Sequence, residues 1–515
     1  MKFTKHASAL ALAFVAASAL ASCGGNDGPS HSDLPEYDGS SEVTISFWNN
    51  YAEDPTPNDP SDDSNYRAYY YMKDMIADFN AKYPNIHVET RAFRNYAAIS
   101  TTIDQGIRDG NTPNLAITYG TYAYNWQEYL VDVTKKGEAM EKDPDINKNY
   151  LDAEKQQYGG KAYYTLPFGK STESLMVNKD VFAATAGQKA GEEAGNYPAP
   201  VAGSTKQAYA HPETFADMMD IARKMKNDYP EVFATQTNDN GYFTAVPLIY
   251  ETTENLFFTV MESAGIPYVA SVDSASEGVL FNNADAKKAV VQLKKWNNEG
   301  LLCVSNNLYF TDEAKGDHAY PSTLFAEGKC FMIIATTRGS AWMAGDGYAV
   351  DYTKLPKWNA SSTVKATSQG GSMAFFRKSN KQEEAASLLF YDFINDRDNF
   401  AKLSIETDYC PIRKSSYETE SLKASLDAAA AGIVASSSKA EKRSAYNGQV
   451  LNLNASYAKN NELFMSPVNK YSSKLRSAVS GLITNVFSDK TAKSDSEIEA
   501  LVDSEFAKAY QATVA

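Results

Sequence analysis

The chain has 515 residues, of which 43% are hydrophobic and 22% charged, and its formal net charge at pH 7 is −15. This length exceeds what one hydrophobic core usually supports, so the sequence predicts two lobes. The acidic balance disfavours nucleic acid and anionic lipid surfaces as partners, because both carry negative charge themselves.

The first 22 residues have the pattern of a secretory signal. Lys2 and Lys5 precede a run of small apolar residues, 7–20, that is too short to span a bilayer comfortably. The following LASC sequence resembles the lipobox of bacterial lipoproteins, whose cysteine is lipidated and becomes the first residue after cleavage. We therefore expect a signal peptide at 1–22, a lipid anchor at Cys23 and a flexible tether over 23–42. An uncleaved membrane anchor is the alternative.

Strand and helix patterns then alternate along the chain, which predicts the α/β class. β-rich runs at 43–48, 85–93 and 114–120 surround a helical pattern at 66–84, as in a parallel sheet with a crossover helix. A Gly-, Ala- and Pro-rich stretch at 185–205 predicts an exposed insertion. Further strands are expected within 165–182, at 330–336 and at 370–376, and helices at 213–228, 284–300, 380–405 and the C-terminus, with N-caps at Thr214, Asn283 and Ser494.

Motifs for catalysis and metal binding are missing from the sequence. It contains no HExxH, GxSxG or phosphate-binding loop, and no cysteine pair has zinc-ligand spacing. The acidic stretch 53–66 offers oxygen ligands for calcium but departs from the EF-hand spacing, so a solvated loop is the simpler interpretation. If Cys23 carries lipid, at most one disulfide can form among Cys303, Cys330 and Cys410, and free buried thiols are preferred.

Three clusters at strand ends suit the binding of a small molecule. They read GKSTES (169–174), IATTRGSAW (334–342) and SQGGSM (368–373). Strand ends are where ligands settle in open α/β sheets, hydroxyl groups can orient a ligand, and glycines allow its close approach. The 33 tyrosines add flat faces with hydroxyl groups, which suit sugar rings, although most of them are expected to be ordinary core and surface residues.

From about Val43 to its end, the chain resembles the extracellular solute-binding proteins of bacterial ABC importers, in the family of maltose- and glycerol-3-phosphate-binding proteins. The matching segments come in family order, and LPFGKSTESLMVNKD and ETDYCPIRKSSYE are the most specific. The resemblance implies a two-lobed α/β fold of the periplasmic-binding-protein type with hinge strands between the lobes. It places lobe one at 43–172 plus 368–406 and lobe two at 173–367 plus 407–515.

By the same resemblance, the solute contacts come from loops and strand ends that face the cleft. Trp48 matches an aromatic residue near the cleft, and Tyr96 a contacting tyrosine of glycerol-phosphate binders. Ser171 stands where those proteins place a contacting serine and maltose binders a glutamate. Thr337 lies near a contacting hydroxyl, Trp342 resembles a sugar-stacking tryptophan, and Tyr409 matches the tyrosine of a TGYLP-like motif. The candidate set is completed by Tyr119, Thr172, Glu173, Gly370 and Gly371.

Two departures weaken the glycerol-phosphate interpretation. Those binders have a glutamate where this chain has Gly120, and neither Arg443 nor Arg476 lies in a motif that matches their phosphate-binding arginine. Three aromatic residues follow instead, which suit a platform for a sugar or, alternatively, pack inside the lobe: Tyr122, Tyr124 and Trp126.

The sequence thus predicts a monomeric binding protein with no catalytic residue, cofactor or metal. Its expected partners are a small solute (a sugar or a polyol phosphate) and the transmembrane subunits of an ABC permease, with no nucleic acid. It is expected on the extracytoplasmic face of the cell membrane, anchored by lipid at Cys23. A carbohydrate, most simply an oligosaccharide, is the preferred solute, and glycerol 3-phosphate or a glycerophosphodiester is the alternative. An extracellular glycosidase or a surface adhesin are the alternatives from other classes.

Overall fold

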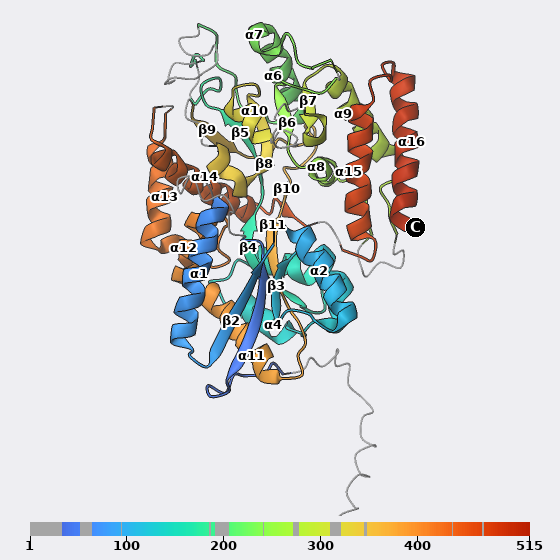
Figure 1. The fold of residues 1–515 in the computed structure, drawn as a ribbon. Coiled ribbons are helices and arrows are strands. Elements are labelled where there is room, and N and C mark those ends of the chain that lie inside the picture. Colours follow the sequence, from blue (N-terminus) through green and yellow to red (C-terminus); the bar gives the residue numbers. More distant parts are fainter. Residues whose placement is uncertain are drawn as a thin grey trace, which may run out of the picture.

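The protein is built around two separate β-sheets, each covered by helices (Figure 1). The computed structural model describes residues 33–51, 64–93, 95–184, 187–190, 205–239, 241–270, 278–308, 321–343, 348–434, 436–465 and 468–515. We call the first sheet with its helices lobe one and the second sheet with its helices lobe two. The leader, Cys23, most of the 53–66 stretch and most of the 185–205 insertion lie outside the described residues.

The sheet of lobe one has the strand order β2-β1-β3-β11-β4. Its strands are β1 (Val43–Asn49), β2 (Ile86–Ala92), β3 (Leu115–Thr118), β4 (Thr165–Ser171) and β11 (Gln369–Phe375). β1 pairs in parallel with β2 and β3, as the sequence predicted, whereas β11 runs antiparallel between β3 and β4. The surrounding helices are α1 (Ser64–Lys82), α2 (Tyr96–Asp109), α3 (Gly120–Ala123), η1 (Tyr124–Tyr129), α4 (Thr134–Lys142), α5 (Lys148–Gln156), α11 (Lys381–Ile394) and α12 (Arg397–Thr407).

The sheet of lobe two has the order β7-β6-β8-β5-β9. Its strands are β5 (Glu173–Asn178), β6 (Leu248–Tyr250), β7 (Leu302–Val304), β8 (Met332–Thr336) and β9 (Val350–Thr353). The remaining helices are α6 (Phe215–Asp228), α7 (Pro230–Phe233), α8 (Thr253–Ala264), α9 (Ala284–Asn298), η2 (Ser305–Asn307), α10 (Pro321–Ala326), η3 (Thr337–Met343), η4 (Lys414–Glu418), α13 (Glu420–Ala431), α14 (Lys439–Lys459), α15 (Ser472–Ser488) and α16 (Asp495–Val514). Helices α15 and α16 pack against α8 and α9, and form the flank of the molecule at which the chain ends (Figure 1).

The chain passes between the sheets at three places. β4 ends at Ser171 in the first sheet and β5 begins at Glu173 in the second, so that Thr172 lies between them. A short ribbon formed by β10 (Ala366–Thr367) and β12 (Leu463–Phe464) precedes the return into β11. After α12, Cys410 exchanges two backbone hydrogen bonds with Lys170, of 2.6 and 3.1 Å. These crossings form the hinge region of the two-lobed fold.

Local sequence signals explain where the helices begin and end. Thr214 and Ser494 each form a complete capping box, with the side chains of Asp217 and Glu497 three residues later. Asn283 accepts from two backbone amides at the start of α9. The three predicted N-caps are therefore confirmed.

The lobes have separate hydrophobic cores. The core of lobe one lies between its sheet and helices α1, α11 and α12, where Phe47, Phe79 and Phe390 meet edge to face. The core of lobe two is larger and includes α6, α8, α9 and the four C-terminal helices α13 to α16. Each lobe can therefore keep its shape while the crossings between the sheets bend.

Residues 33–42, which we expected to belong to the tether, contact lobe one. Leu34 and Tyr37 pack against its core, and the amide of Asp38 donates to Gln382 of α11 over 2.8 Å. A cavity of about 1070 Å³ separates this segment from α11 and the turn at 82–85. Its described lining comes from lobe one and residues 33–39 alone, so it is not a cleft between the lobes.

Candidate functional site

Three adjoining cavities lie where α15 of lobe two faces lobe one. The hinge cavity, of about 80 Å³, is lined by the β10–β11 segment 367–370, by 119–121 and by Arg476. The middle cavity, of about 480 Å³, shares Thr121 and Arg476 with it, and the outer cavity, of about 470 Å³, shares Tyr122 and Ser473 with the middle one. Together they form a continuous row between the lobes, which we call the cleft.

Helix α15 forms the lobe-two wall of the cleft with one polar face. The residues that line the middle cavity recur every three or four positions, which places them on one side of a helix. Apart from Arg476, their side chains are short and mostly carry hydroxyl or amide groups: Ser473, Ser477, Ser480, Gly481, Thr484 and Asn485. A Cβ atom built on Gly481 meets nothing within 4 Å, so the wall is open at this point.

Tyr119 and Tyr122 line the cavities from the lobe-one side, and Tyr96 packs against Tyr119. The rings of Tyr96 and Tyr119 lie 4.3 Å apart between centroids, and those of Tyr119 and Tyr122 lie 6.3 Å apart in a stacked arrangement. The hydroxyl groups of Tyr96 and Tyr409 share a hydrogen bond of 2.9 Å. Burial is the main cause that raises the pKa of Tyr96 and Tyr119 above the ordinary value, so these rings stay neutral in the physiological range.

Glycines in β11 allow this arrangement. A Cβ atom on Gly371 would lie 2.3 Å from Ile117 and 3.3 Å from the Tyr96 hydroxyl oxygen. Gly370 has a φ of +99° and touches the backbone of Gly169, where any side chain would collide. The two glycines thus let β11 pass close to the tyrosines and to β4.

Tyr409 is placed by the turn that ends α12. Asp408 closes the helix in the left-handed conformation (φ 55°), which turns the chain toward β4. The ring of Tyr409 lies against Gly169 and beneath the Arg338 guanidinium, whose central carbon is 5.3 Å from the ring centroid.

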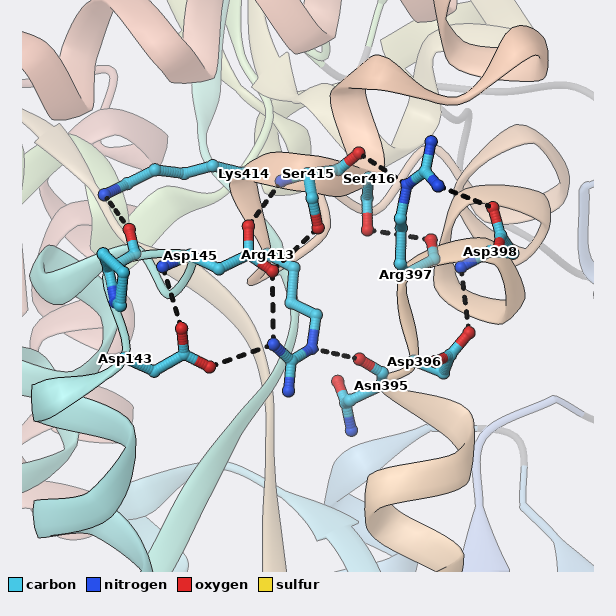
Figure 2. Close-up of polar contacts among 11 residues, drawn as sticks. Asp143, Asp145, Asn395, Asp396, Arg397, Asp398, Arg413, Lys414, Ser415 and Ser416 are labelled. Carbon is cyan, nitrogen blue, oxygen red and sulfur yellow. Dashed lines mark hydrogen bonds and ion pairs between the residues drawn. The ribbon is translucent and has the colours of Figure 1, made fainter.

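A polar network holds the segment that follows Tyr409 to lobe one (Figure 2). The Nη1 atom of Arg413 lies 3.2 Å from carboxylate oxygens of both Asp143 and Asp145, and its Nε donates to the carbonyl of Asn395 over 3.0 Å. Ser415 donates to Asp145 from its amide and its hydroxyl, over 2.6 and 2.7 Å. Although burial opposes it, the bonds from Ser415 and Arg413 hold the pKa of Asp145 below its usual range. These bonds therefore fix the backbone that follows Tyr409 to lobe one.

The predicted residues at the first crossing bond within the protein. Thr172 donates from its hydroxyl to the Thr367 carbonyl over 2.8 Å, and its backbone exchanges two bonds with Thr337, of 2.8 and 3.1 Å. Ser171 is buried opposite Gln369 in the sheet register. The bond from Thr172 to Thr367 joins the first two crossings beside the hinge cavity, and the backbone bonds between Lys170 and Cys410 join the third crossing to the first.

Glu173 is fully buried at the first position of β5. Its carboxylate accepts from the hydroxyl of Tyr250 over 2.6 Å and from the amide of Asn255 over 2.8 Å. Burial is the largest cause that raises the pKa of Glu173 to about 7, the nearby carboxylate of Glu251 adds to it, and the two hydrogen bonds and Arg476 oppose it. Glu173 thus faces Tyr250 and Asn255, and is linked to the cleft only through its partners.

Two features of the site had no clear signal in the sequence. Arg476 reaches the cleft from α15, and its Nη2 lies 2.9 Å from Glu254 and 2.8 Å from the Asn255 side-chain oxygen. Beneath the hinge cavity, Lys170 and Glu154 form a fully buried ion pair of 2.8 Å, and Glu154 also accepts from Ser372 over 2.6 Å. The contact of Arg476 with Asn255 joins residues 221 positions apart, and that of Ser372 with Glu154 joins residues 218 positions apart, so no local pattern connects them. Lys170 and Glu154 are only 16 positions apart, but they come from different elements, β4 and α5.

The remaining aromatic candidates lie differently. Trp48 packs against Phe93 in the interior of lobe one, and Trp126 is buried with its indole N–H donating to Asp104 over 2.7 Å. For Trp126 the packing alternative therefore holds, whereas Tyr122 lines the middle and outer cavities. Trp342 belongs to η3, and its side chain lies outside the described part.

Cys303, Cys330 and Cys410 are free and buried, as preferred from the sequence. Among the described residues there is no cluster of potential metal ligands, and no helix there has the length and apolar character to cross a membrane.

Comparisons with known proteins agree on one architecture. Residues 74–430 match the family model described as bacterial extracellular solute-binding protein. A maltose-bound MalE3 protein from T. maritima is similar with a TM-score of 0.59 at 12% identity, over 90% of this chain and 99% of that one. UgpB from Mycobacterium tuberculosis in complex with glycerophosphocholine gives 0.60 at 12%, over 92% and 100%. A putative oligosaccharide-binding protein from Synechococcus gives 0.60 at 13%, over 91% and 99%. No curated protein sequence matches the chain.

Proposed function

Because this chain belongs to the family of bacterial extracellular solute-binding proteins, we propose that it is the substrate-binding lipoprotein of an ABC importer. It captures a neutral carbohydrate, most simply an oligosaccharide, between its lobes and delivers it to the transmembrane subunits of the permease. It acts as a monomer without a cofactor and is held at the outer face of the cell membrane by lipid on Cys23.

The composition of the cleft is the observation that carries the carbohydrate proposal. One wall offers the faces and hydroxyl groups of tyrosines, and the other offers the serines, threonine and asparagine of α15. A sugar has apolar ring faces and hydroxyl edges, so it can stack on the first wall and form hydrogen bonds with the second. The row of cavities also extends beyond one narrow site, which favours an oligosaccharide over a single ring.

Closure of the lobes supplies the mechanism. Tyr122 and α15 stand on opposite lobes, so a solute that contacts both stabilises the closed form by its difference in affinity for the two states. The crossings at Thr172, Thr367 and Cys410 are bonded together and provide the hinge. The permease then recognises the closed form.

The residues of the cleft also argue against the other functions: a glycerophosphodiester binder, a glycosidase and an adhesin. A glycerophosphodiester binder needs an available cation in its cleft, whereas Arg476, the arginine among the described lining residues, is already paired with Glu254. A glycosidase needs two carboxyl groups placed across the solute. Of the carboxylates, only Glu254 lines the cleft among the described residues, and it is engaged in that ion pair. An adhesin has no need for a cleft that closes.

Thermal unfolding of residues 24–515 with a panel of solutes tests the proposal. The panel contains mono- and oligosaccharides, glycerol 3-phosphate and glycerophosphodiesters. A ligand at one hundred times its dissociation constant stabilises by about 2.7 kcal/mol, which raises the melting temperature measurably. Stabilisation by an oligosaccharide that is recovered unchanged supports the proposal. Turnover of the sugar would indicate an enzyme, and stabilisation by glycerol phosphates alone would replace the solute class.

A further inference from the structure

Among the described residues that line the middle cavity, Arg476 is the cation, and it is held in place by three residues of α8. Its Nη2 atom contacts Glu254 and Asn255 at the start of α8, and its guanidinium carbon lies 5.9 Å from the ring centroid of Phe258. Both polar contacts use Nη2, so the hydrogens on Nη1 and Nε point to no other described acceptor. Arg476 also lines the hinge cavity, so its side chain borders two of the three cavities of the cleft.

Two carboxylates compensate the charge of this arginine. Glu254 is in direct contact at 2.9 Å. Glu173 acts indirectly, through Asn255. The Oε1 atom of Glu173 accepts from the Nδ2 of Asn255, and the Oδ1 of Asn255 accepts from Arg476. The asparagine has one orientation that satisfies both neighbours, since its oxygen must face the arginine and its nitrogen the carboxylate. Glu173, Asn255 and Arg476 therefore form a continuous polar chain from the crossing at Thr172 to the cleft.

This arrangement differs from a phosphate clamp. An arginine that binds phosphate offers a fork of N–H groups with its positive charge uncompensated. Here a doubly charged group beside Arg476 would also meet the Glu254 carboxylate and the field of Glu173. Lys474, the other cation that lines the described part of the cleft, borders the outer cavity alone.

We infer that Glu254 and Glu173 set the charge selectivity of the cleft, Glu254 by direct pairing with Arg476 and Glu173 as a positioning residue that acts through Asn255. Arg476 then serves as a donor of hydrogen bonds to neutral hydroxyl groups, and solutes with a phosphate group are rejected. This inference rests on the proposed function for the nature of the natural solute, but its charge rule concerns Arg476 itself.

The test is whether removal of one carboxylate allows the full mature chain to bind phosphate compounds. Inorganic phosphate, glycerol 3-phosphate and glucose 6-phosphate are titrated by calorimetry at low and at physiological salt against wild type, Glu254→Gln and Glu173→Gln. Glu299→Gln is the matched control, because it removes a carboxylate that is ion-paired with Arg223 at 2.6 Å on the surface of lobe two. It changes the net charge of the protein equally and leaves the cleft intact.

We expect Glu254→Gln to bind at least one of the phosphate probes at least tenfold more tightly than wild type, with the gain weakened by salt. Glu173→Gln should show a smaller gain, and Glu299→Gln none. A neutral oligosaccharide found in the thermal panel should keep its wild-type affinity in Glu299→Gln, whose carboxylate lies outside the cleft.

Three results would overturn the inference: tight binding of phosphate esters by wild type, no gain in Glu254→Gln, or an equal gain in Glu299→Gln. Failure of this inference can be distinguished from failure of the proposed function. If no neutral sugar binds wild type, the carbohydrate proposal fails, yet the phosphate titrations still decide whether the carboxylates exclude anions.

Discussion

Replacement of Glu173 by glutamine should change the free energy of unfolding more favourably at pH 8 than at pH 5, when the variant is compared with wild type at the same pH. Burial in the hinge raises the pKa of Glu173 from 4.5 to about 7. A carboxyl group whose pKa is raised by folding contributes stability below its unfolded pKa, and this contribution is lost as the pH rises through its folded pKa. A difference of one pKa unit between the folded and unfolded states corresponds to about 1.36 kcal/mol. The wild type should therefore lose about 2 to 3 kcal/mol of its free energy of unfolding between pH 5 and pH 8 because of Glu173.

Glutamine keeps the hydrogen bonds of the site without the charge. Its oxygen can accept from Asn255, and its nitrogen can donate to Tyr250, whose hydroxyl can turn to Thr259 at 3.2 Å. The free energy of unfolding of Glu173→Gln minus that of wild type should therefore rise by about 2 to 3 kcal/mol between pH 5 and pH 8.

Urea denaturation at half-unit intervals of pH measures this difference, and comparison with Glu299→Gln removes the general effect of one carboxylate. A difference that stays constant with pH, or that changes equally in Glu299→Gln, would refute the assignment of a perturbed carboxyl group at the hinge.

Three further predictions concern the buried ion pair, a glycine of β11 and the polar network that follows Tyr409. Lys170→Met should destabilise the protein by about 3 to 5 kcal/mol in urea, because it leaves Glu154 buried without its cation, and addition of Glu154→Gln should recover much of the loss; a double variant no better than the single one would contradict this. Gly371→Ala should lower the affinity for the solute at least tenfold by calorimetry while costing about 1 to 3 kcal/mol in stability, since the new methyl group collides with Ile117 and crowds the Tyr96 hydroxyl; unchanged affinity would show that Tyr96 does not contact the solute. Asp145→Asn should flatten the loss of stability between about pH 5 and pH 3, because the depressed pKa of Asp145 contributes stability above its unfolded pKa that is lost as the pH falls; parallel curves for variant and wild type would count against this role.

The sequence predicted those features that depend on neighbours along the chain. Helix caps at Thr214, Asn283 and Ser494 lie where the side chains that form them are only two or three residues away. The parallel start of the first sheet followed from alternating apolar periods in consecutive segments. The family resemblance also brought Tyr96, Tyr119 and Tyr409 into the candidate set, and the fold places their rings and hydroxyl groups together. Whether they bind the solute stays a prediction.

By itself, the sequence determined the α/β class, the three helix caps and the family, because these depend on local periodicity and on ordered motifs. The expectation of one helix at 380–405 was wrong, because Asp396 caps a new helix and the segment divides into α11 (Lys381–Ile394) and α12 (Arg397–Thr407). Only the tertiary structure decided which polar groups face the solute path and which bond to one another. Glu173 and Arg476 are 303 positions apart, and their connection through Asn255 exists only because β5, α8 and α15 converge. The physical reason is that a polar atom is available to a solute only if the fold leaves that atom without a closer partner, and partners from distant segments are set by packing.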